Sequence, residues 1–225
     1  TGETTLDATE NGNAAGITLD GTNNFVGPVN SDGANVELND VTGGITLGTT
    51  TTTGTLDVTS SDGDITQQSG TSITAGGEST LTSNADVTLD SANNDFQATV
   101  NLSGVNLTVT DGTGGLALGN TTATGTLDAT STDGAITQAN GTSINVTGET
   151  TLDATENGSA ADITLDGTNN FVGPVNTDGA NVELNDVTGG ITLGTTTTTG
   201  TLDVTSSDGD ITQQSGTSIT AGGES

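Results

Sequence analysis

The 225-residue chain contains no cysteine, methionine, histidine, lysine, arginine, tryptophan or tyrosine, and only three phenylalanines. Without cysteine or histidine it can form neither a disulfide framework nor a thiolate or imidazole metal site. Without a cationic side chain it has nothing to pair with phosphate, so we expect no nucleic-acid partner and no polybasic membrane contact. No apolar run of about 18 residues is present, so we expect no membrane insertion of this segment.

Large apolar residues are also scarce. Leu, Ile, Val and Phe together make up 45 of the 225 residues, while 29 residues are acidic and the formal charge is −29. An apolar share near 20% with a high net charge lies at the boundary of intrinsic disorder. The pattern of residues therefore has to decide whether the chain folds.

An internal repeat is the dominant pattern. Residues Thr1–Ser79 return as Thr147–Ser225, 146 positions later, with differences only at 13/159, 16/162 and 31/177. A diverged copy lies between them, because Phe25 corresponds to Phe96 after 71 positions and to Phe171 after a further 75. We divide the chain into units at about 1–75 (A), 76–146 (B) and 147–225 (A′, extending into the next B). Because solenoids need terminal caps that are missing here, we expect residues 1–225 to be one continuous segment of a longer array.

Within each unit, apolar and polar residues alternate over short runs such as Val36–Leu38 and Val105–Val109, separated by Asn-Gly and Asp-Gly turns. A period of two predicts strands, and no helical stripe competes with it. A long near-identical period in an all-β chain favours a parallel β-solenoid, in which coils stack and share a thin core. We expect the Asn-Asn pairs before each Phe to sit at a turn and stack their amides between coils. We also expect Ala8–Gly16 to be a variable surface loop, because Leu6 to Leu19 spans 13 positions and the matching Leu81 to Leu89 spans 8.

Three runs carry a family resemblance: Gly54–Gln67, Gly125–Gln138 and Ile17–Phe25. They resemble the degenerate repeats of filamentous-haemagglutinin-like giant adhesins, and the resemblance extends over the whole chain. It implies a right-handed parallel β-helix that is secreted and displayed as a surface fibre. It transfers no binding site, and the absence of Lys and Arg departs from a surface that would bind anionic glycans.

The acidic residues suggest a role for cations. Coils of roughly 18 to 24 residues at about 4.8 Å each give one carboxylate per 1.6 to 2.1 Å of fibre, close to the charge spacing of duplex DNA. Asp62 and Asp64 flank a glycine turn, as do Asp208 and Asp210. These four are the candidate Ca²⁺ ligands, and the alternative is a solvated turn whose Asp and Gly serve backbone geometry. No cofactor is required by this reading; Ca²⁺ or other counter-cations are the expected ligands.

Two further interpretations concern activity. Paired carboxylates are the minimum for glycoside hydrolysis, but aromatic platforms and cationic partners are absent. Every acid in A also recurs in A′, and Asp162 is the one acid of A′ without a counterpart in A. We therefore expect no enzyme. The threonine runs 49–53 and 195–199 suggest an ice- or mineral-binding face; the simpler alternative is that threonine is a good exposed strand residue whose successive side chains alternate faces.

The sequence thus predicts the shaft of an extracellular or cell-surface fibre, with self-association between neighbouring repeats or fibres as its expected partnership. The alternative is a binding module whose Thr or Asp face engages ice, mineral, Ca²⁺ or a neighbouring fibre. A binding face would show one flat ladder of a single residue type, whereas a shaft would show mixed outward residues.

Overall fold

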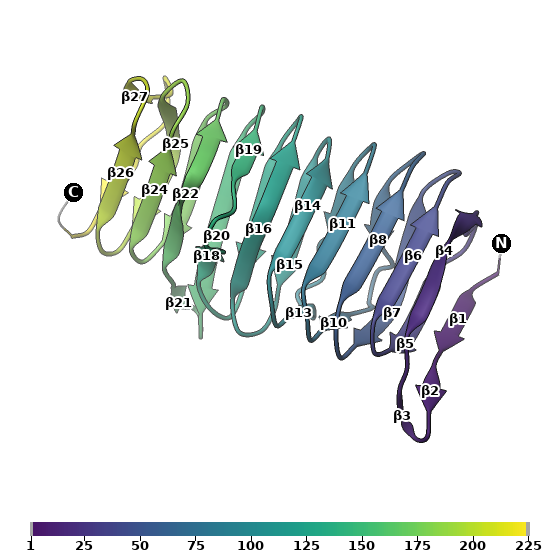
Figure 1. Cartoon of the computed structure of the whole chain (residues 1–225). Helices are drawn as coiled ribbons and strands as arrows, with labels where there is room; N and C mark the ends of the chain where they lie inside the picture. The colour runs from purple at the N-terminus through teal and green to yellow at the C-terminus, as the bar shows by residue number, and fades with distance from the viewer. Residues whose placement is uncertain (1, 224–225) are drawn as a thin grey trace.

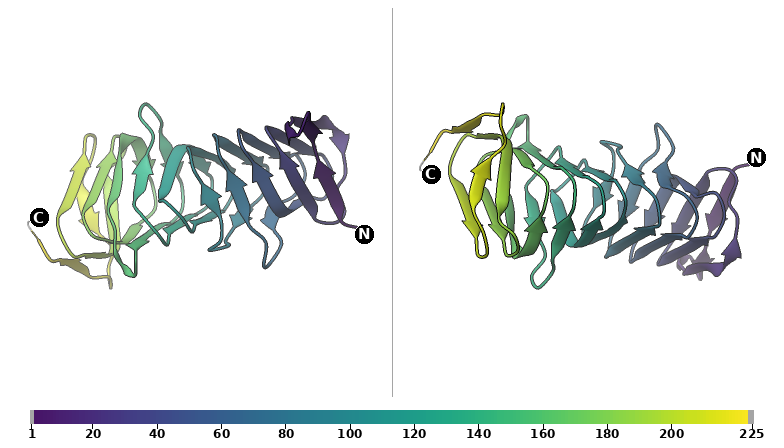
Figure 2. Two further views of the ribbon diagram at one scale, coloured as in Figure 1. Left: turned by 90° about the horizontal axis from the view of Figure 1, so that it is seen from below. Right: turned by 90° about the horizontal axis from the view of Figure 1, so that it is seen from above.

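The structure is a computed structural model that describes residues 2–223. Two long sheets of parallel strands run the length of an elongated body, with the N- and C-termini at opposite ends (Figures 1 and 2). The chain alternates between the sheets, so that each pair of strands forms one coil of a β-solenoid. This confirms the predicted fold class, and no helix that could span a membrane occurs among the described residues.

The larger sheet, sheet 1, has fifteen strands. They are β1 (Thr4–Asp7), β5 (Val29–Gly33), β7 (Ile45–Thr52), β9 (Ile65–Gln67), β10 (Ile73–Ala75), β12 (Val87–Leu89), β13 (Asp95–Phe96), β15 (Leu107–Asp111), β17 (Leu127–Ser131), β20 (Thr150–Glu156), β21 (Ser159–Ala160), β23 (Val175–Gly179), β25 (Ile191–Thr198), β27 (Ile211–Gln213) and β28 (Ile219–Ala221).

Sheet 2 has eleven strands, and a two-stranded hairpin stands apart from both sheets. The strands of sheet 2 are β4 (Ile17–Asn23), β6 (Val36–Asp40), β8 (Leu56–Ser60), β11 (Ser79–Ser83), β14 (Val100–Gly104), β16 (Leu116–Ala123), β18 (Ile136–Gln138), β19 (Ile144–Val146), β22 (Ile163–Phe171), β24 (Val182–Asp186) and β26 (Leu202–Ser206). The hairpin consists of β2 (Thr9–Glu10) and β3 (Asn13–Ala14).

Successive coils pair in register. The step between paired residues ranges from 17 positions (Asn23 to Asp40) to 27 (Ile136 to Ile163). The longest steps contain a hairpin, because Thr155–Ala160 form an antiparallel excursion like that of β2 and β3. The predicted Ala8–Gly16 surface loop is thus a hairpin. In Figure 1 the front strands point upward while the chain advances from right to left, which is the right-handed winding predicted for the coil.

The number of strands per repeat is odd, and the length of the sequence repeat does not indicate this. From β5 to β12 the main path contains seven strands, β5, β6, β7, β8, β9, β11 and β12, before the equivalent of β5 returns as β14. Seven is odd, so β14 lies in sheet 2 whereas β5 lies in sheet 1. Likewise β7 is in sheet 1, β16 in sheet 2 and β25 in sheet 1 again. Consecutive repeats therefore display the same features on opposite sides of the solenoid.

The phenylalanines show this alternation. Equivalent residues of neighbouring repeats do not stack into a common ladder: the register partner of Phe96 is Ala75 in sheet 1, and that of Phe171 is Val146 in sheet 2. Only residues 146 positions apart return to the same side. The 146-residue unit corresponds to seven complete coils.

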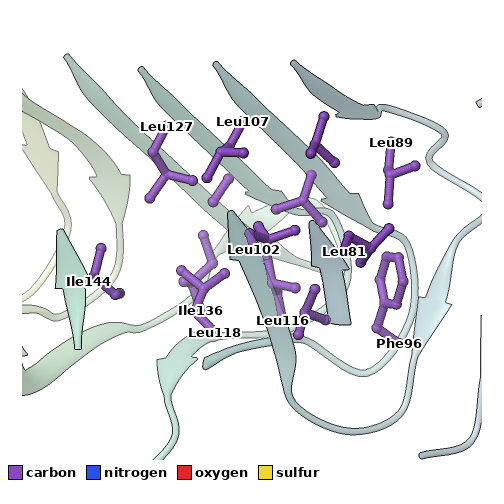
Figure 3. Packing of buried hydrophobic residues seen from close by; sticks show 14 of the residues in the cluster. Leu81, Leu89, Phe96, Leu102, Leu107, Leu116, Leu118, Leu127, Ile136 and Ile144 are labelled. Carbon is purple, nitrogen blue, oxygen red and sulfur yellow. The ribbon is translucent and has the colours of Figure 1, made fainter. Parts of the chain in front are cut away.

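The core lies between the two sheets and follows the alternation of the strands. In β6, Val36, Leu38 and Asp40 are buried while Glu37 is exposed. Leucines and isoleucines from both sheets meet in a continuous column along the axis (Figure 3). Each coil is covered above and below, so a small number of large apolar side chains is enough to exclude water.

Buried amides close the coils at one corner. Asn94 and Asn169, each two residues before a Phe, are fully buried. The Asn94 Nδ2 donates to Gln67 Oε1 at 3.0 Å, and Gln67 Nε2 donates back to Asn94 Oδ1 at 2.7 Å. Asn169 and Gln138 form the same pair at 3.0 and 2.7 Å. The second Asn of these pairs thus bonds to a glutamine of an earlier coil. The expected stacking of equivalent Asn amides is not found among the described residues, because neighbouring repeats face opposite sides of the solenoid.

Candidate functional site

The predicted cation ligands lie in exposed turns between sheet 2 and sheet 1. Ser60 Oγ donates to the carbonyl of Gly63 at 2.7 Å, and Gly63 has a φ of +123°, a conformation that favours glycine. The Asp64 carboxylate accepts the backbone N–H of Asp86, in the next coil, at 3.1 Å. Asp62 is exposed. The structure therefore gives Asp64 a part in joining coils.

The A′ turn repeats this geometry, with Ser206 Oγ donating to the carbonyl of Gly209 at 3.1 Å between Asp208 and Asp210. Within residues 2–223 no three carboxylates converge as a metal ligand set would. Among these residues the structure brings no third acid to either aspartate pair. The Ca²⁺ assignment of these four aspartates stays a prediction.

A second feature recurs in all three repeats where the register slips by one residue. Asn30, Asn101 and Asn176 occupy equivalent positions at this bulge. Their Nδ2 groups donate to Glu3, Glu78 and Glu149 at 2.5, 2.6 and 2.8 Å. Their Oδ1 atoms accept the backbone N–H groups of Thr49, Asn120 and Thr195 at 2.7, 2.9 and 2.8 Å. A side chain in place of the neighbouring Gly48, Gly119 or Gly194 would overlap the amide, which explains the glycine at that point.

A shallow groove follows each bulge. In the A-type copies it is acidic, whereas the B copy has Thr82 and Ser103 where A′ has Asp153 and Asp178. Burial, followed by the charges of Asp178 and Asp128, raises the pKa of Asp153. Burial also raises the pKa of Asp57 and Asp128. Because of the odd strand number, the A-type grooves open on sheet 1 and the B groove on sheet 2.

Outward threonines form only a short ladder. On sheet 1 the register aligns Thr46, Thr66, Thr88 and Thr108, and the Thr46 and Thr66 hydroxyls are 3.0 Å apart. The next position is Asp128. The equivalent column on sheet 2 runs Ala117, Thr137, Thr164, Glu183 and Asp203. The outward surface is mixed in type from coil to coil.

Three aspartates at equivalent positions are buried, although aspartate is usually an outward-facing residue. Asp40, Asp111 and Asp186 are equivalent, and each is 0% exposed. The backbone N–H of Phe25 donates to Asp40 at 2.6 Å, and that of Phe171 to Asp186 at 2.9 Å. Asp111 accepts the N–H of Thr113 at 3.1 Å. The sequence signal for these aspartates is that one occurs in every copy, A and B alike, three positions before the first residue of a Gly-Gly pair.

Asp111 is held in an environment that disfavours its charge. Its Oδ2 is buried without a hydrogen-bond partner, as is the Oγ of Ser131, its register partner on the next coil. Burial raises the pKa of Asp111 to about 6, against the opposing effect of backbone N–H groups at Thr113, Phe96 and Gly112, and the charge of Asp95 raises it further. A protonated carboxyl there could donate a hydrogen bond that the carboxylate cannot.

These features define a class: a parallel β-solenoid of tandem repeats, whose surface recurs on alternating sides. Family comparison is consistent with that class. The chain belongs to the family described as repeats of unknown function (DUF5649), whose units match residues 33–103, 104–178 and 179–225. The starts of these units are 71 and 75 residues apart, the same steps that separate the three phenylalanines. No curated protein and no solved structure matches the chain.

Proposed function

We propose that the chain is a non-catalytic shaft segment of a secreted or cell-surface fibre. The observation that carries this proposal is the uninterrupted stacking of coils over the described residues, with parallel strand pairing on both sheets from one end to the other (Figure 1). Each coil is bonded to its neighbours through the backbone, so extension of the array lengthens a rod without adding a new core.

The surface supports a mechanical role in preference to a single recognition site. The outward columns change residue type between coils, and the grooves are shallow and repeated. Lack of Lys and Arg leaves no cleavage site for trypsin-like proteases, and lack of Cys and Met removes sulfur oxidation targets. These properties suit a rod that is exposed outside the cell.

The recurring bulge groove favours a second candidate, a binding module. Three equivalent grooves combine an Asn–Glu pair with outward Thr side chains, and two of them add aspartates. A repeated weak site of this kind could contact a neighbouring fibre or a cation-coated surface through many copies. It needs no catalytic group.

The length of the rod tests the shaft proposal. Seven coils at about 4.8 Å predict that each added 146-residue unit lengthens the particle by about 34 Å without changing its width. Electron microscopy or atomic force microscopy of chains with one, two and four such units should show this linear increase. Growth in width, or dimensions that scale as those of a random coil, would contradict the proposal.

Cations should stabilise the rod by screening its charge. With 29 acids and no basic side chain, the melting temperature is expected to rise by several degrees between about 20 and 500 mM NaCl. If the aspartate turns bind Ca²⁺, adding Ca²⁺ at the same ionic strength should raise the melting temperature further. The double variant Asp62→Asn, Asp208→Asn should lose this Ca²⁺-dependent increase and keep the increase caused by NaCl. A melting temperature independent of salt and of chelator would refute the cation role.

A further inference from the structure

An apolar side chain projects from the same connection in each A-type repeat. Val172 is 64% exposed in the connection from β22 to β23, and Val26, its equivalent, is 67% exposed. Gly173 has no room for a side chain against the backbone of Gly148, so this connection is pressed onto the preceding coil and Val172 points away from it. The Val172 N–H donates to the carbonyl of Val146 at 2.9 Å, which fixes the backbone below the exposed side chain.

The B repeat has a hollow instead of a projection at the equivalent place. It measures about 510 Å³, and its floor includes Ala98, Ala117 and Ala135. Thr46 and Asp64 occupy the positions of Ala117 and Ala135 in the A repeat, where the Thr46 hydroxyl bonds to Thr66. The hollow therefore exists because the B repeat replaces larger polar side chains with alanine. We call it the alanine groove.

The projection and the groove lie on opposite edges of the solenoid. The connection after β22 runs from sheet 2 to sheet 1, at the upper edge in Figure 1. The groove lies where β13, β15 and β17 of sheet 1 lead into β14, β16 and β18 of sheet 2, at the lower edge. The odd strand number produces this opposition. Val26 and Val172 lie 146 residues apart on the upper edge, and an array that continues the A–B pattern would repeat the groove on the lower edge with the same period.

We propose that a second copy of this chain docks side by side, with Val172 or Val26 of one copy in the alanine groove of the other. The inference goes beyond the shaft function, which does not require lateral contact. Because the two contacting edges differ, the interface is heterologous and each copy can receive a neighbour on both edges. Since the projection and the groove share one period, parallel fibres brought into register once are in register at every repeat.

The size and charge of the contact set its strength. Ten coils present an edge of about 48 Å by 10 Å, or roughly 480 Å² per partner, below the roughly 800 Å² of a standard stable interface. Two single chains therefore pair weakly, and longer arrays pair through the sum of contacts. Both edges carry acids, Asp95 at the groove and Asp208 on the opposite edge among them, so association strengthens as salt increases.

Disulfide trapping tests the contact at low affinity, because the chain has no cysteine of its own. Val172→Cys chains mixed with Ala117→Cys chains in 500 mM NaCl should yield at least fivefold more heterodimer than Val172→Cys mixed with Thr122→Cys. Thr122 is an exposed residue of sheet 2 that lines the bulge groove of the B repeat and lies outside the alanine groove. Equal yields in the two mixtures would overturn the proposal.

Matched variants provide an equilibrium test. Ala117→Thr fills the groove with the residue of the A repeat, and Val172→Gln with Val26→Gln removes the projection with the residue of the B repeat. Sedimentation should show salt-enhanced association of the wild type, little for either variant alone, and restored pairing limited to dimers when the two are mixed. A wild type that stays monomeric at all salt concentrations, or variants that associate as it does, would refute lateral docking while leaving the rod length unaffected.

Discussion

Replacing Asn169 by alanine is expected to destabilise the solenoid by about 4 kcal/mol, because each buried polar group left without a partner costs roughly 1–3 kcal/mol. Asn169 accepts the N–H of Ile144 at 2.9 Å and donates to the carbonyl of Leu165 at 3.2 Å, in addition to its two bonds with Gln138. The substitution removes all four bonds at once. Chemical denaturation followed by far-ultraviolet circular dichroism would measure the loss.

The chain supplies its own control for this change. Asn23 is equivalent to Asn169 but is only half-buried, and its Nδ2 donates to the carbonyls of Leu19 and Asn39 at 2.9 and 3.0 Å without a glutamine partner. Asn23→Ala should therefore cost about half as much or less. A double-mutant cycle between Asn169→Ala and Gln138→Ala should give a coupling of about 1–3 kcal/mol. Additive single effects would show that the amide pair contributes nothing of its own.

Stability is expected to increase as the pH is lowered from 8 to 5. The pKa of Asp111 is raised from 3.8 to about 6 in the folded chain, so the native state binds the proton more tightly than the unfolded state. The stability that this proton gives is complete below pH 3.8 and is lost as the pH rises through about 6. At 1.36 kcal/mol per pKa unit, Asp111 alone accounts for at most about 3 kcal/mol. The raised pKa values of Asp57, Asp128 and Asp153 act in the same direction.

Thermal melts at pH 5, 6, 7 and 8 at constant ionic strength would measure this dependence. Asp111→Asn should flatten the curve and raise the melting temperature at pH 8, because the buried charge is gone and the amide can donate to Ser131 Oγ. Asp90→Asn, which changes an exposed carboxylate, should shift the whole curve slightly without changing its shape. A wild-type chain that is most stable at pH 8, or an unchanged slope in Asp111→Asn, would contradict the role given to Asp111.

Much of the fold could be read from the sequence because its cause is local. Alternation such as Val36, Glu37, Leu38 states which side of a strand faces the core, and near-identity at 146 positions states that coils repeat. The side of the solenoid on which each repeat displays its features could not be predicted in the same way. It depends on whether the number of strands per repeat is odd or even, and short elements such as β13, with two residues, carry too little pattern to be counted.

The surface features were predicted less well, because they depend on contacts between coils and on differences between the repeat copies. An aspartate is expected to face outward because of its charge. The residues around Asp111 do not indicate that it is buried and that its carboxylate accepts the backbone N–H of Thr113. Asp64 is predicted as a cation ligand from the sequence, and the structure adds a contact that the sequence does not indicate: its carboxylate accepts a backbone N–H from the next coil. The alanine groove could not be predicted because it is a difference between copies, visible only when Ala117 and Thr46 are placed in equivalent surroundings.

Because two repeats make seven coils, a single repeat contains three and a half coils. This number also constrains how such an array can change in length. Gaining or losing one 71- or 75-residue repeat turns everything beyond it by half a revolution about the long axis, so every feature downstream changes sides. Gaining or losing a 146-residue pair preserves the rotational phase and shifts downstream features only along the axis. A fibre whose edges differ should therefore tolerate changes in pairs far better than single ones, much as binding sites on a double helix tolerate insertions of whole helical turns.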